Sequence, residues 1–71
     1  MRPHPFVAST HASASKYTEA TIRHLNEAQA ATDMEGRTHA IQAALFFARR
    51  ALTELERAEQ LQDELERRTH A

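Results

Sequence analysis

The sequence predicts an all-α fold in which two antiparallel helices form a hairpin, and three observations lead to this prediction. Residues 15–71 contain no proline and are rich in alanine, glutamate, arginine, glutamine and leucine, which favour helices. The only glycine, Gly36, lies near the middle of this stretch. The apolar residues after it recur at intervals of three and four, which is the spacing of one helix face. A short connection between two such helices makes them antiparallel neighbours.

The first 14 residues are predicted to form a flexible N-terminal arm. They contain Pro3 and Pro5, many serine, threonine and alanine residues, and no apolar period. The apolar run at residues 6–8 is too short for the hydrophobic region of a secretory signal. Nowhere do 18 apolar residues follow one another, so we expect no membrane span and a cytoplasmic protein.

The helical hairpin is predicted to occupy residues 15–71, with a short first helix at about residues 15–32. Ser13 or Ser15 is the expected N-cap, because serine accepts hydrogen bonds from the free backbone N–H groups of a first turn. The expected inward stripe follows the helical spacing and consists of Thr18, Thr21, Ile22, Leu25, Ala28 and Thr32.

The turn is predicted at about residues 33–37 and the long second helix at about residues 38–68. Two alternatives exist for the turn. Gly36 ends the first helix in a left-handed conformation and Thr38 caps the second, or Asp33 caps a second helix that starts at residue 34. We favour Asp33, because Glu35 then lies where a negative charge suits the helix dipole.

The second helix carries an apolar arc of about 200°, which is wider than one neighbouring helix covers. The chain has only fifteen large apolar side chains among 71 residues and no cysteine, so disulfides do not stabilise it. Self-association is then the simplest way to complete a core, and we expect a homo-oligomer, with a homodimeric four-helix bundle as its form. The expected oligomer interface consists of Ile41, Leu45, Ala48, Leu52, Leu55, Ala58, Leu61 and Leu65.

Phe46 lies away from this arc, beside Arg49 and Arg50. Aromatic and arginine side chains are enriched where proteins bind one another. We therefore expect Phe46, Arg49 and Arg50 to contact an external protein partner. The alternative is that Phe46 packs in a second subunit interface or under the N-terminal arm.

No catalytic, cofactor or metal site is predicted. The chain has no Gly-rich phosphate loop, and its five histidines are not spaced as metal ligands on a helix. His24 and Glu27 are three residues apart, but they make only one pair of ligands. We therefore expect a protein that is not an enzyme.

The charge pattern does not favour nucleic acid as a partner. The net charge is −1, and Glu35, Glu54, Glu56 and Glu59 are interleaved among the arginines of the second helix. The expected function is therefore that of a small homo-oligomeric protein-binding module, such as an adaptor, a chaperone or a bacterial or phage inhibitor of a larger protein. The alternative is a nucleic-acid-binding regulator built on a dimer of hairpins.

Overall fold

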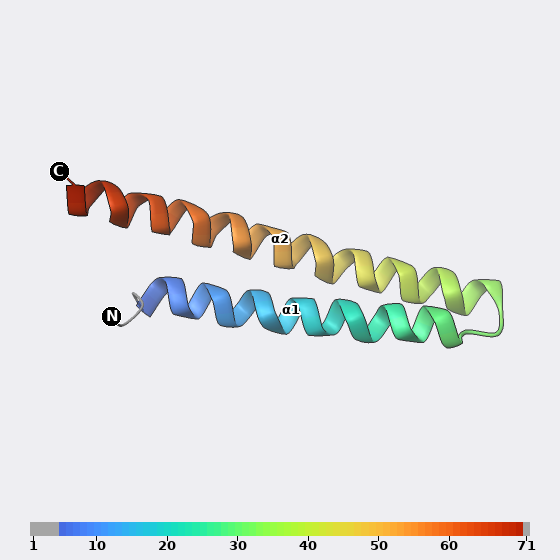
Figure 1. Cartoon of the computed structure of the whole chain (residues 1–71). Helices are drawn as coiled ribbons and strands as arrows, with labels where there is room; N and C mark the ends of the chain where they lie inside the picture. Colours follow the sequence, from blue (N-terminus) through green and yellow to red (C-terminus); the bar gives the residue numbers. More distant parts are fainter. Residues whose placement is uncertain (1–4, 71) are drawn as a thin grey trace.

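The computed structural model describes residues 5–70 as two long helices joined by a short turn (Figure 1). Helix α1 spans Pro5–Ala30 with 26 residues, and helix α2 spans Met34–His70 with 37 residues. The helices run side by side in opposite directions, and no strand occurs in the described residues. The predicted all-α hairpin is therefore confirmed, with a second helix longer than the first, but α1 is longer than the short helix predicted at about residues 15–32.

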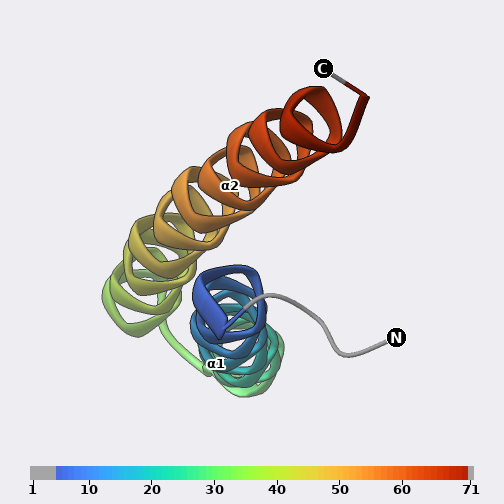
Figure 2. The same cartoon turned by 90° about the vertical axis from the view of Figure 1, so that its left-hand side faces the viewer.

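The molecule is a thin rod of 57 × 17 × 12 Å. The C-terminal part of α2 extends past the start of α1, and the end-on view shows that it also leads away from α1 (Figure 2). Within the described residues, neither helix combines the length and the apolar character needed to cross a lipid bilayer.

Helix α1 begins at Pro5, ten residues before the predicted start at about residue 15. Proline suits the first position of a helix, because its missing N–H would have no partner there. Thr10 and Ala14 are both buried, so this part of α1 packs on α2. The predicted caps, Ser13 and Ser15, consequently lie inside the helix. Of the predicted arm, residues 5–14 belong to α1, and residues 1–4 lie outside the described residues.

The turn comprises residues 31–33, and α2 begins at Met34 rather than at residue 38. The Asp33 carboxylate accepts a hydrogen bond of 2.9 Å from the backbone N–H of Gly36, and the Asp33 carbonyl accepts one of 3.2 Å from Arg37. Gly36 does not adopt a positive φ. The predicted cap at Asp33 is thus confirmed, and the left-handed glycine is excluded. An added Cβ at Gly36 would lie only 2.6 Å from the Asp33 carboxylate, so glycine leaves room for this cap.

Alanine supplies nearly all of the buried residues between the two helices. We use the name alanine seam for the seven buried alanines, which are Ala14, Ala20, Ala28, Ala40, Ala44, Ala51 and Ala58. Ala44, Ala51 and Ala58 are seven residues apart, as expected for a stripe that follows a neighbouring helix closely. No large side chain of the described residues is fully buried. The hairpin therefore has a close contact between its helices but little apolar core.

The predicted inward stripe of the first helix is only partly correct. Ala28 is buried, and Thr21 is half-buried with its hydroxyl donating a 2.8 Å hydrogen bond to the Tyr17 carbonyl. Ile22 and Leu25, in contrast, are exposed. A seam built from alanine brings the helices so close that no space remains for larger side chains between them.

Replacing Asp33 by alanine tests the cap. We expect Asp33→Ala to lower the free energy of unfolding by about 1 kcal/mol, because the backbone N–H of Gly36 loses its acceptor. Chemical denaturation followed by circular dichroism at one fixed protein concentration measures this loss. Thr32→Ala, an exposed neighbour, is the matched control and should change the stability much less. Equal effects of the two variants would contradict the cap.

Replacing Ala44 by leucine tests the alanine seam. We expect Ala44→Leu to destabilise the hairpin by about 1–3 kcal/mol, because the larger side chain forces the helices apart. Ala12→Leu adds the same atoms at an exposed position of α1 and should be nearly neutral. Thermal unfolding of both variants at equal concentration gives the comparison. A seam that accepts leucine at residue 44 without loss of stability would not be close-packed.

Candidate functional site

The large apolar side chains that the alanine seam excludes gather on one side of the hairpin. Ile22 and Leu25 project from α1, and Ile41, Leu45, Leu52 and Leu55 project from α2, each with 45–57% of its surface exposed. Ala48 is exposed in the same row of α2. We call these seven residues the apolar face. Soluble proteins rarely leave such a row uncovered, so this face is the strongest candidate for a binding surface.

Two recesses show that the contributions of α1 and α2 lie on the same side. Leu25 and Ile41 line one recess together with Ala28, Gln29 and Arg37, close to the turn. Leu55 lines a second recess with Ala14 and with His11, Ser15, Thr18 and Glu19 of α1. The apolar face is therefore two helices wide near the turn. Further along, only the α2 side is apolar.

The eight residues of the predicted oligomer interface lie on different sides of α2 in the structure. Five of its eight residues, namely Ile41, Leu45, Ala48, Leu52 and Leu55, are exposed in one row of α2. Ala58 instead belongs to the alanine seam and is buried against α1. Leu61 lines a recess with Ser9, Thr10 and Ser13 of α1, and Leu65 is half-exposed. The reason is the early start of α1, which covers a part of α2 that we expected to be free.

The sequence reasoning did not place Ile22 and Leu25 in the binding surface. The pattern that identifies them is the row of alanines at intervals of seven in α2, with Ala14 and Ala28 fourteen residues apart in α1. Alanines in such rows predict a close contact between helices, and the neighbouring large residues then have to point elsewhere.

The opposite side of the hairpin carries a cluster of rings around Phe47. The Phe47 ring stacks on the imidazole of His24 with a centroid distance of 5.4 Å, and on the Tyr17 ring at 6.3 Å. Phe46 meets Phe47 edge to face at 5.2 Å. Ring pairs in these geometries stabilise a structure beyond the area that they bury. The cluster is the nearest approach to a conventional core in this molecule.

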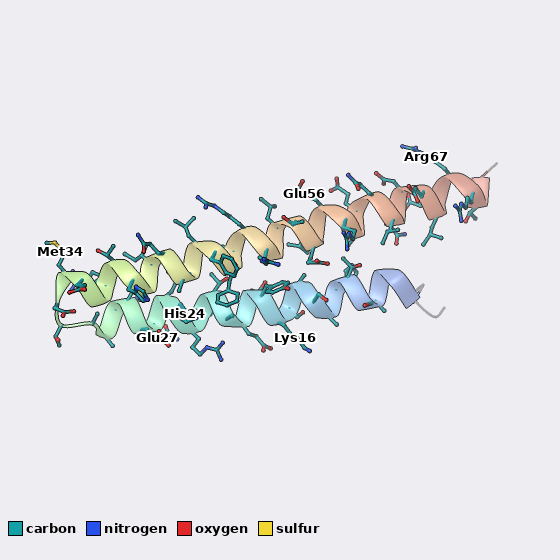
Figure 3. All side chains as sticks on the ribbon, turned by 180° about the vertical axis from the view of Figure 1, so that it is seen from behind. Lys16, His24, Glu27, Met34, Glu56 and Arg67 are labelled. Carbon is teal, nitrogen blue, oxygen red and sulfur yellow. The ribbon has the colours of Figure 1, made fainter. Side chains whose placement is uncertain are left out.

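His24 and Glu27 are next to each other on α1 (Figure 3), with 3.0 Å between Nδ1 and Oε2. This is the one contact between a basic and an acidic side chain within 4.0 Å among the described residues, and the Glu27 side chain is largely exposed. Among the residues that the structure describes, no group of three or more potential metal ligands occurs. His24 therefore belongs to the ring cluster, and its hydrogen bond with Glu27 orients the imidazole ring.

Phe46, Arg49 and Arg50, the predicted partner surface, come together on α2. They line one recess with Gln42, Thr53 and Glu54. The Arg50 guanidinium carbon lies 4.9 Å from the centroid of the Phe46 ring, and the ring is half-exposed. A cation over an exposed ring is stabilised by about 0.5–1 kcal/mol. We call these three residues the Phe46 surface. It lies on another side of α2 from the apolar face.

Comparisons with protein-family models, with curated proteins and with solved structures found no match to this chain. The function is therefore inferred from the two surfaces of the hairpin.

Proposed function

We propose that this protein is a homo-oligomeric protein-binding module, in which two hairpins pair through the apolar face into a four-helix bundle. One observation carries the proposal. The six large side chains of the apolar face are half-exposed, whereas the buried apolar residues between α1 and α2 are all alanines. A second hairpin supplies the missing second layer of a core.

The apolar face is large enough to drive association. Each large side chain that is half-exposed gains about 1 kcal/mol when the rest of its surface is removed from water. Six side chains from each of two copies thus contribute on the order of 10 kcal/mol before the loss of translational and rotational freedom. The difference between the free energy gained by burial and the free energy lost with this freedom supports a dimer that dissociates at measurable concentrations.

The Phe46 surface is proposed to contact a further protein. It combines an exposed aromatic ring with two guanidinium groups, which is the composition of protein-binding hot spots. Its position on α2 leaves it free when the apolar face is covered. The dimer would then act as an adaptor, a chaperone or an inhibitor that presents the same surface twice.

Replacing Leu45 by glutamine tests the proposed self-association. We expect Leu45→Gln to raise the dissociation constant of the dimer roughly 30-fold or more, because each dimer loses two apolar contacts of about 1 kcal/mol. Light scattering over a dilution series, with helicity measured by circular dichroism on the same samples, gives the constant. Phe46→Leu is the control, since Phe46 is similarly exposed on another side of α2 and leucine keeps an apolar side chain beside Phe47, so this change should leave the dimer intact.

A well-folded monomer of 8.1 kDa at all concentrations would contradict the proposed oligomer. Binding to DNA or RNA that weakens steeply with added salt would favour the alternative, a nucleic-acid-binding regulator. An apolar protein interface changes little with salt, so the two functions give opposite results in one titration.

A further inference from the structure

We propose that the two α2 helices of the dimer pack antiparallel, with the two-fold axis passing beside Ala48. This inference rests on the proposed function. It specifies that a second copy of the chain covers the apolar face, with one fixed alignment of the two α2 helices. The exposed row of α2 is nearly symmetrical about Ala48. Ile41 lies seven residues before it and Leu55 seven after, and Leu45 and Leu52 lie three before and four after. An antiparallel second copy therefore places Leu55 on Ile41 and Leu52 on Leu45.

The sizes of the side chains support a two-fold axis beside Ala48. Two packed helices are closest at their crossing point and separate on both sides of it. Ala48 is the one small residue of the row from Ile41 to Leu55, and it stands in the middle. The larger leucine and isoleucine side chains then fill the wider space on either side.

The charges that flank the row follow the same symmetry. Arg37 lies eleven residues before Ala48 and Glu59 lies eleven residues after it. Arg37 lines a recess of the apolar face beside Ile41, and Glu59 follows Leu55 by one helical turn. The proposed register brings Arg37 to Glu59 of the second copy, and the two-fold axis repeats this ion pair. The Arg37 guanidinium has donors to spare, because its one described hydrogen bond is a 3.4 Å contact with the Ala31 carbonyl.

The other symmetrical arrangements fit less well. A parallel pair of α2 helices would set Arg37 against Arg37 and Glu59 against Glu59, and like charges repel. A dimer in which α2 packs on α1 of the second copy would bring Leu52 and Leu55 to the polar part of α1. That part consists of His11, Ser15 and Thr18, which already lie at the level of Leu55 within one chain.

Cysteine trapping tests the register, because the natural chain has no cysteine and any introduced thiol is the only one. Ala48→Cys should form a disulfide-linked dimer quickly under mild oxidation, since residue 48 lies near the axis and disulfides need Cβ atoms about 4 Å apart. Ile41→Cys and Leu55→Cys should each link poorly alone, whereas their equimolar mixture should give the linked heterodimer. Gln60→Cys, an exposed position outside the apolar face, measures random collisions.

Other trapping patterns would overturn the register without overturning the dimer. Rapid linkage of Ile41→Cys alone and Leu55→Cys alone would show a parallel pair. Linkage of Ala48→Cys to Thr18→Cys would show α2 packed on α1 of the second copy. A protein that light scattering shows to be monomeric would instead overturn the proposed function itself.

Exchange of the flanking charges gives a second test that keeps the apolar residues in place. We expect Arg37→Glu and Glu59→Arg each to raise the dissociation constant about five- to tenfold, because two ion pairs per dimer become like-charge contacts. The double variant and the equimolar mixture of the two single variants should both restore pairing. Arg23→Glu and Glu64→Arg make the same charge changes at exposed positions elsewhere and serve as controls. Failure of the double variant to recover would contradict the contact between Arg37 and Glu59.

Discussion

The close contact along the alanine seam is the constraint on which the rest of the molecule depends. Alanine has no side chain beyond Cβ, so the seven buried alanines allow α1 and α2 to pack closely. A seam of this kind buries little apolar area for each residue, and it leaves no room for leucine or isoleucine between the helices. The large apolar side chains are therefore placed outside, where they form the apolar face. The same contact thus determines how the chain folds and which surface it offers to other molecules.

A hairpin with this seam depends on what covers its outer face. No large side chain is fully buried among the described residues, and the ring cluster around Phe47 is the nearest to a core. Most of the stability of a helix in a protein comes from tertiary packing of its apolar side, so burial of Ile41, Leu45, Leu52 and Leu55 would also stabilise α2, which carries them. If two copies pair through this face as proposed, folding and association are linked, and the stability of the hairpin rises with its concentration. The proposed interface would then serve the fold as well as the function.

Sequence reasoning identified the features that local chemistry decides. The helical composition, the cap at Asp33 and the exposure of Phe46 all follow from residue type and spacing, and the structure has all three. The start of α1 could not be predicted in this way, because Thr10 and Ala14 are held by packing on α2 and not by an apolar period of their own. Ile22 was predicted to be buried and is exposed, whereas Ala58 was predicted to lie in the oligomer interface and is buried against α1. Hydrophobicity alone favours burial of isoleucine, but the close spacing of the two helices leaves room only for alanine between them.

The two surfaces differ in what a partner must displace. In the proposed dimer, a protein that docks on the apolar face competes with the second copy, so its affinity is reduced by the free energy of dimerisation. A protein that docks on Phe46 and Arg50 meets no such competition, because those side chains lie on another side of α2. An elongated dimer with two copies of the Phe46 surface also binds a repeated or dimeric target more tightly than a single hairpin does, when the spacing of the target allows both contacts. The alanine seam supports the proposed bivalent binding, because it leaves six large apolar side chains outside on the apolar face, whereas the Phe46 ring lies on another side of α2.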